Sequence, residues 1–136
     1  WLFWNLDFNY AIARTDGDTG EEFIPLAPDL TSTSGLSAKH PSGFFAGVQA
    51  RHLSDRPANE DNSIVAEGYT IVDANAGMEF KRFQIGVNVQ NLFNTKWNET
   101  QFATLSRLQS ETEGIEEIHF TPGTPFFFQG SIAYKF

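Results

Sequence analysis

The 136-residue chain is predicted to be all-β, an antiparallel transmembrane β-barrel segment of about six strands. Three observations predict this fold. Apolar and polar residues alternate along six segments, as they do in strands with one apolar and one hydrated face. The connections between these segments alternate between long and short, which is the arrangement of outer-membrane barrels. The last segment keeps this alternation up to a terminal phenylalanine.

The composition agrees with strands and restricts the possible functions. Aromatic residues make up 15% of the chain and include 14 Phe, which favours strands. No run of about 18 apolar residues is present, so a membrane-spanning helix is excluded, whereas barrel strands escape such a criterion. The formal net charge of −8 argues against a nucleic-acid partner, which requires a basic face. With no cysteine, disulfides and thiol chemistry are excluded.

The first segment, Trp1–Arg14, has the clearest alternation. Its large apolar residues occupy every second position: Leu2, Trp4, Leu6, Phe8, Tyr10 and Ile12. The residues between them, from Asn5 on, are polar or small. The run exceeds an ordinary strand of about 5–6 residues and suits the roughly 9–11 residues that a tilted strand needs to cross a bilayer. Because the chain opens inside this run, we expect it to be part of a longer protein.

Five further segments are predicted as strands: Leu30–Ala38, Phe44–Leu53, Thr70–Phe80, Phe83–Val89 and Phe126–Phe136. Their polar faces are rich in Asn, Gln, Gly, Ser and Asp, where the solvent face of a soluble sheet usually carries Lys, Glu and Thr. This mixture favours a hydrated barrel interior, although soluble sheets alternate too. The residues predicted to face this lumen are Asp73, Asn75, Glu79, Asn88 and Gln90.

The connections set the orientation of the predicted strands. Those at Thr15–Asp29, Ser54–Tyr69 and Asn91–Pro125 are long, whereas Lys39–Gly43 and Lys81–Arg82 are short. Compact soluble domains seldom contain loops beyond about 12–15 residues without a function for them. Outer-membrane barrels place long loops outside the cell and short turns in the periplasm. The last strand therefore runs towards the periplasmic rim.

The last strand also resembles a known signal. Apolar residues stand at every second position back from the terminal aromatic, as Ile132, Tyr134 and Phe136. This pattern resembles the C-terminal strand signature of bacterial outer-membrane proteins, which the barrel-assembly machinery recognises. The resemblance implies that these three residues form a barrel-assembly signal, since an alternating edge strand is a template for strand addition.

A second motif is similar to one family in particular. The sequence Val87-Asn-Val-Gln-Asn-Leu-Phe-Asn94 resembles the V-x-N-L-F-D/N box in the penultimate strand of TonB-dependent receptors. In these receptors a long outer loop and the terminal strand follow the box, and the same order holds here. Ile24-Pro-Leu-Ala-Pro28, Asp55-Arg-Pro-Ala-Asn59 and Gly68-Tyr69 also resemble segments of this family.

The resemblance implies that residues 1–136 form the C-terminal part of a 22-stranded receptor barrel, with the plug domain and earlier strands absent. It implies TonB-dependent uptake of a scarce nutrient, such as a ferric chelate, cobalamin or an oligosaccharide, across the outer membrane of a Gram-negative bacterium. The implied partners are outer-membrane lipid, the barrel-assembly machinery, a small-molecule substrate, and TonB through the missing N-terminal region. No cofactor and no resident metal are implied.

No enzyme constellation is evident. The three histidines are far apart in sequence, and no nucleophile elbow or phosphate loop occurs. Asp73 and Glu79 share a strand face at a separation of about 20 Å, too far for joint acid–base work. The longest loop contains four glutamates and a histidine within nine positions, Glu111, Glu113, Glu116, Glu117 and His119. A ligand site there is one hypothesis, with Glu116, Glu117, His119 and Phe102 as candidates, and a solvated acidic loop is the other.

Two other classes of protein stay open. A soluble β-sandwich or a lipocalin-like module that binds a small ligand would also show alternating strands. A barrel enzyme of the outer membrane would need a Ser/His/Asp-type cluster, which this segment lacks. A requirement for detergent would separate the membrane barrel from the soluble module.

The predicted facing of one strand is testable by substitution. Val87→Arg places a charge on the predicted lipid face and should cost about 2–4 kcal/mol in the membrane-inserted protein. Asn88→Arg, one residue along on the predicted lumen face, should be tolerated far better. Unfolding in lipid vesicles measures both, and equal costs would contradict the facing.

Overall fold

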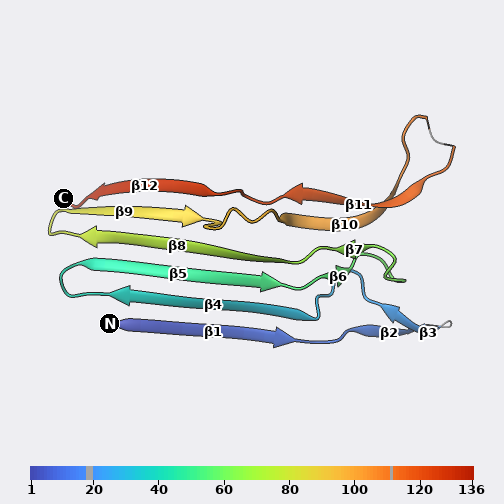
Figure 1. Ribbon diagram of the computed structural model, residues 1–136, viewed down its shortest axis with the longest axis horizontal. Helices are drawn as coiled ribbons and strands as arrows, with labels where there is room; N and C mark the ends of the chain where they lie inside the picture. The colour runs from blue at the N-terminus through green and yellow to red at the C-terminus, as the bar shows by residue number, and fades with distance from the viewer. Residues whose placement is uncertain (18–19, 111) are drawn as a thin grey trace.

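The computed structural model describes residues 1–17, 20–110 and 112–136. It is all-β and antiparallel, as predicted, and its main element is a six-stranded sheet with the order β1-β4-β5-β8-β9-β12 (Figure 1). The strands of this sheet are β1 (Leu2–Tyr10), β4 (Leu30–Lys39), β5 (Phe44–Leu53), β8 (Tyr69–Glu79), β9 (Phe83–Gln90) and β12 (Phe127–Tyr134). The six predicted strands are confirmed.

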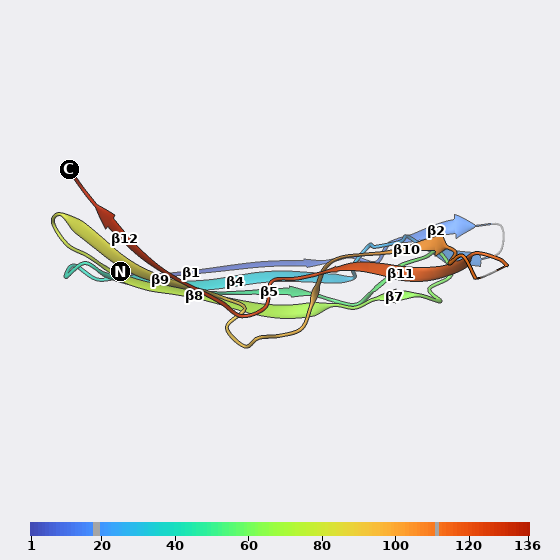
Figure 2. The ribbon, with the colours of Figure 1, turned by 90° about the horizontal axis from the view of Figure 1, so that it is seen from above.

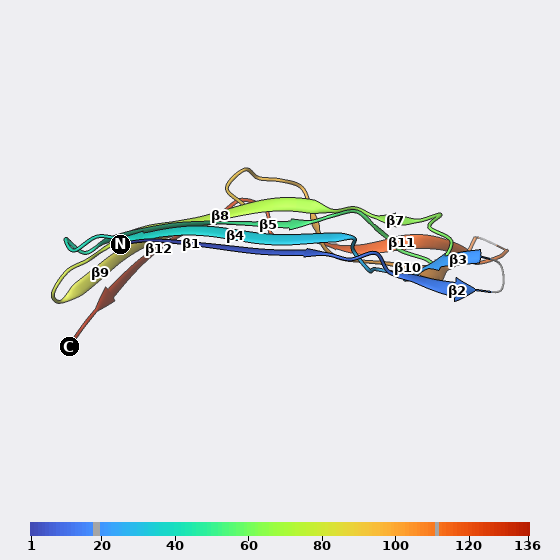
Figure 3. The same cartoon turned by 90° about the horizontal axis from the view of Figure 1, so that it is seen from below.

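The sheet is a single, gently curved layer in the two edge-on views, and β12 bends away from it towards the C-terminus (Figures 2 and 3). Every pairing within it is antiparallel. Its outer strands β1 and β12 each pair with one neighbour, so in the part of the chain that the structure describes the sheet is open. No helix long and apolar enough to cross a membrane occurs among these residues.

The register divides the sheet into two chemically different faces. Directly paired residues lie on the same face, and one row of six crosses every strand with apolar residues alone. This row is Trp4, Leu36, Val48, Ala74, Val89 and Phe128. A row on the opposite face is largely polar and comprises Phe3, Ser37, Gly47, Asn75, Asn88 and Gln129. The predicted alternation therefore extends across the whole sheet.

No second layer of protein covers the apolar face among the described residues. Trp4, Phe8 and Ile132 are 72%, 67% and 79% exposed, and the buried apolar residues number three, Ala58, Ala66 and Ile71. The solvent-accessible surface is 9896 Å² for a mass of 15.2 kDa. A compact globular protein of this mass would expose about 7,100 Å². The described residues thus bury little apolar surface for a chain of this mass.

The long connections contain strands, and the prediction that they are plain loops is wrong. They hold three two-stranded hairpins beyond one end of the sheet (Figure 1). The hairpins pair β2 (Arg14–Gly17) with β3 (Gly20–Phe23), β6 (Arg56–Pro57) with β7 (Val65–Ala66), and β10 (Asn98–Ser106) with β11 (Ile115–Pro122). Local backbone pairing satisfies the hydrogen-bonding groups of these long segments.

Two strand ends differ from the prediction by more than one residue. The first strand, predicted to extend to Arg14, ends at Tyr10, and Arg14 starts β2. Beyond Tyr10 the partner strand β4 has ended, although the Ala11 nitrogen still donates to the Asp29 oxygen at 3.0 Å. The terminal strand pairs over Phe127–Tyr134 rather than to Phe136, because β9 begins at Phe83, which is the partner of Tyr134.

The two short connections are tight turns, as predicted. In the first, Gly43 has a φ of 96°, and its nitrogen donates to the His40 oxygen at 3.0 Å. A Cβ at Gly43 would stand 2.1 Å from the Glu79 carbonyl oxygen, so this turn requires glycine. The Glu79 nitrogen donates to the Gly43 oxygen at 2.9 Å, which joins this turn to the end of β8.

Asn91 joins the sheet to the longest connection. It follows β9, is 2% exposed and has a positive φ of 49°. Its Nδ2 donates to the oxygens of Thr95 and Thr124 at 2.8 and 3.0 Å, and its Oδ1 accepts from the Thr95 nitrogen at 2.8 Å. One side chain therefore holds the two ends of the segment that contains β10 and β11. Nearby, Asn94 Oδ1 accepts from the Phe126 nitrogen at 3.0 Å.

We predict that Asn91→Ala destabilises the fold by roughly 2–4 kcal/mol, because the buried side chain makes three hydrogen bonds to the backbone of Thr95 and Thr124, and all three are lost. Asn88→Ala is the matched control, since the Asn88 side chain makes no hydrogen bond within the described structure. Urea unfolding followed by tryptophan fluorescence measures both variants. A change at Asn91 no larger than that at Asn88 would contradict the role assigned to Asn91.

Candidate functional site

A polar hollow of about 300 Å³ lies on the polar face of the sheet. Two glycines open it: a Cβ at Gly35 would stand 2.6 Å from Asn5 Oδ1, and a Cβ at Gly47 would stand 2.5 Å from Asn75 Oδ1. The amide side chains thus lie over neighbouring strands where a larger residue would exclude them. The polar side chains that line the hollow are Asn5, Ser37, Gln49, Asp73, Asn75 and Asn88.

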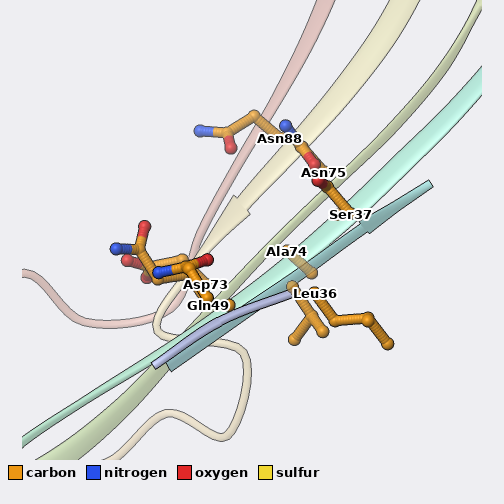
Figure 4. A pocket seen from close by; sticks show the side chains of 11 residues that line it. Leu36, Ser37, Gln49, Asp73, Ala74, Asn75 and Asn88 are labelled. Carbon is orange, nitrogen blue, oxygen red and sulfur yellow. The ribbon is translucent and has the colours of Figure 1, made fainter. Parts of the chain in front are cut away.

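Figure 4 shows the opposite directions of polar and apolar side chains at this hollow. Asp73, Asn75 and Asn88 point to one side of the sheet, and Leu36 and Ala74 point to the other. Amide groups both donate and accept hydrogen bonds, and the single carboxylate only accepts. The site is therefore suited to binding a polar, hydrogen-bonding surface, and its lining contains no histidine, lysine or cysteine.

The five residues predicted to face a lumen share one face of the sheet. Asp73, Asn75 and Asn88 meet in the hollow, with Asn75 directly paired with Asn88. Glu79 lies at the short-turn end of the same face, opposite Gln84. Gln90 lies at the far end of β9, opposite Phe127. The sequence prediction did not single out Asn5 and Gln49, although their positions in the alternating pattern were a usable signal.

Two carboxylates of this face, Asp73 and Glu79, have cationic partners within the chain. Asp73 Oδ2 lies 3.4 Å from Arg51 Nη2, and its Oδ1 accepts from the Asn91 nitrogen at 2.9 Å. Glu79 accepts a hydrogen bond from Lys135 Nζ and forms an ion pair with Lys39 at 3.7 Å. Both acids are thus paired with cations on or next to other strands of the sheet.

Three of the four candidate ligand residues of the longest loop lie together, and Glu116 does not join them. They lie on the hairpin β10–β11, where Phe102 is the direct partner of His119, and the two rings stack with centroids 5.9 Å apart. Glu117 accepts from Ser106 Oγ at 2.5 Å and lies 3.9 Å from His119. Glu116 is on the opposite face, since side chains alternate along the strand.

Glu116 has a structural partner instead of a ligand. Its Oε2 accepts from Asn59 Nδ2 at 3.2 Å, and Asn59 also bonds to Ser63 Oγ at 2.8 Å and to the Ile64 nitrogen at 3.1 Å. No group of three metal-ligating side chains occurs among the described residues, and Glu111 lies outside them. Nearby, hydrogen bonds from Ser63 lower the pKa of Asp61. The described residues of the acidic hairpin therefore contain no assembled metal site.

Gln101 makes a buried contact that the sequence analysis did not predict. It is 3% exposed, its Nε2 donates to the Glu67 oxygen at 2.6 Å, and its Oε1 accepts from the Glu67 nitrogen at 3.0 Å. The side-chain amide thus makes two hydrogen bonds to the Glu67 backbone, as the backbone of a neighbouring strand would. These bonds join β10 to the end of β7. A glutamine in a strand of unknown neighbours gives no sequence signal for such a contact.

The segments that resembled receptor motifs also meet at this end. The Leu26 nitrogen donates to the Pro57 oxygen at 2.7 Å, which joins Ile24–Pro28 to Asp55–Asn59. Leu26 has a positive φ of 63°, and the Ala27 nitrogen donates to the Ile24 oxygen at 3.2 Å. This geometry is a turn with Pro25 at its second position, a place that proline favours. Both motifs therefore serve the packing of the long connections.

The predicted assembly signal lies on an edge strand. Ile132 and Tyr134 are 79% and 57% exposed on β12, which pairs with β9 alone among the described strands. The ring of Phe136 contacts that of Tyr134 edge-on, with centroids 5.3 Å apart. The other backbone edge of β12 is thus available for strand pairing.

A comparison of the chain with protein-family models finds no match. The site is therefore interpreted from its geometry alone: a one-layer sheet with an apolar face, a polar hollow on the other face, and hydrogen-bonded hairpins at one end.

We predict that Gln101→Leu releases the hairpin β10–β11 from β7, because the Glu67 backbone loses both of its bonds to the side chain. Limited trypsin digestion should then cleave faster after Lys96 and Arg107, which are exposed on either side of β10. Thr100→Leu, a change at a neighbouring exposed position, is the control. Equal cleavage rates in the two variants would show that Gln101 does not hold the hairpin.

Proposed function

We propose that this chain forms part of an outer-membrane receptor barrel that imports a scarce nutrient, and that its role is transport rather than catalysis. The observation that carries the proposal is the uncovered apolar face, which crosses all six strands. Contiguous exposed apolar surface of this extent is rare on soluble monomers and marks contact with a membrane or a partner.

Lipid is the cover that suits this face best. The six strands have 8 to 11 residues, which is close to the 9–11 residues of tilted membrane-spanning strands. The opposite face carries amides and glycine rather than a second apolar layer. Outer-membrane barrels have this arrangement, with lipid outside and a polar interior.

A soluble β-sandwich is the rival and needs a second sheet over the apolar face. In the described part of the chain, the remaining strands form two-stranded hairpins beyond one end of the main sheet (Figure 1). A lipocalin-like module would instead place its apolar face inside a closed barrel, whereas here β1 and β12 are open edges.

The open edges favour a larger barrel. Backbone groups at a sheet edge have no partner in lipid, and each unpaired group costs several kcal/mol there. We propose that further strands pair with β1 and β12 in the complete barrel, and that the barrel-assembly machinery recognises Ile132, Tyr134 and Phe136. The motif resemblance is the basis for two further parts of the proposal. These are the coupling to TonB and a cargo of ferric chelate, cobalamin or oligosaccharide.

The proposal is tested by cell fractionation. An antibody against this chain should detect an outer-membrane band of very roughly 70–90 kDa, at about 23 residues per strand for a barrel of this family with its plug. Unboiled samples should migrate differently from boiled ones, because folded barrels resist detergent. The matched control is a soluble periplasmic protein from the same cells.

The opposite result is equally clear. A soluble band near 15 kDa that ignores boiling would overturn the receptor proposal in favour of a soluble β module.

A further inference from the structure

The two ends of the sheet carry opposite charge. The short-turn end contains four basic residues, Lys39, Lys81, Arg82 and Lys135, and one acidic residue, Glu79. The described acidic residues of the long-connection end include Asp55, Glu60, Asp61, Glu67, Glu99, Glu113, Glu116 and Glu117. With four basic residues against one acidic residue, the short-turn end therefore has a net positive charge.

Within the basic rim, Glu79 forms ion pairs with two of the four cations. It is bonded to Lys39 and to Lys135 on the polar face of the sheet. Lys81 and Arg82 are exposed in the turn between β8 and β9, and within the described structure neither forms an ion pair. The turn is rigid, because the Phe80 nitrogen donates to the Phe83 oxygen and the Lys135 nitrogen to the Arg82 oxygen, both at 2.8 Å. Two adjacent cations thus stand without an anion.

An apolar hollow of about 350 Å³ lies beside this turn. Small residues of β8 and β9 form its floor, and larger side chains surround it: Phe44, Met78, Phe80, Ile85 and Val87 around Ala76, Gly77 and Gly86. Phe80 stacks on Phe83 with ring centroids 4.3 Å apart and directly precedes Lys81. The hollow is open to the surroundings and nearly free of polar surface.

We propose that this hollow and the Lys81–Arg82 turn together bind one anionic phospholipid. The acyl chain lies in the hollow, and the phosphate lies against the two unpaired cations. Charge complementarity favours this occupant, because two unpaired cations stand directly beside an apolar hollow. The inference rests on the proposed membrane location and adds that the short-turn rim selects anionic headgroups.

The test is lipid titration of the detergent-purified protein that contains this chain, followed by native mass spectrometry. Phosphatidylglycerol and phosphatidylcholine with identical acyl chains are compared. Each basic residue near an anionic lipid contributes about five-fold in affinity. The double variant Lys81→Gln/Arg82→Gln should therefore lose roughly 25-fold in phosphatidylglycerol binding and change little for phosphatidylcholine.

The control variant Lys96→Gln/Arg107→Gln removes the same charge from the long-connection end and should retain phosphatidylglycerol binding. Glycerophosphoglycerol, the headgroup without acyl chains, should not displace the lipid. Equal retention of the two lipids, equal losses in both double variants, or displacement by the free headgroup would each overturn the inference. A protein that enters detergent and vesicles but shows no preference would leave the membrane proposal intact, whereas a protein that remains soluble would overturn both.

Discussion

The in-register antiparallel pairing of six strands is the constraint on which the rest of this structure depends. Because side chains alternate along a strand, a slip of one residue between two strands would move a whole set of apolar groups to the other face. The observed register instead aligns Trp4, Leu36 and Val48 in one row and Ser37, Gly47 and Asn75 in another. One sheet thereby acquires a face suited to lipid and a face suited to water.

Side-chain amides hold together the long-connection end of the molecule, where the buried apolar residues Ala58, Ala66 and Ile71 also lie. Asn91 closes the longest connection, Gln101 pairs with the Glu67 backbone, and Asn59 bridges to Glu116. Each of the three is at least nine-tenths buried. Satisfied amides in such positions substitute for missing strand partners and specify one arrangement. The hairpins can therefore keep a defined shape with few buried apolar residues.

The connections at the two ends of the sheet differ in length, charge and rigidity. The two ends of the molecule are therefore not equivalent. Tight turns and unpaired cations form one rim, while acidic hairpins extend beyond the other (Figure 1). For a sheet that lies in a membrane, such asymmetry supplies an orientation. In the membrane location that we propose, the short rim would lie at the level of anionic headgroups, and the hairpins would project from the opposite side.

The sequence by itself determined the strands and their faces, because a period of two is a local property that each segment carries alone. It placed Asp73, Asn75 and Asn88 on a common polar face and located both short turns. Tertiary structure decided which loop residues meet. Phe102 and His119 stack, Glu116 accepts a hydrogen bond from Asn59, and Gln101 bonds to the Glu67 backbone. Those contacts join residues up to 57 positions apart, and no local pattern encodes them, since they depend on how three hairpins pack at one end of the sheet.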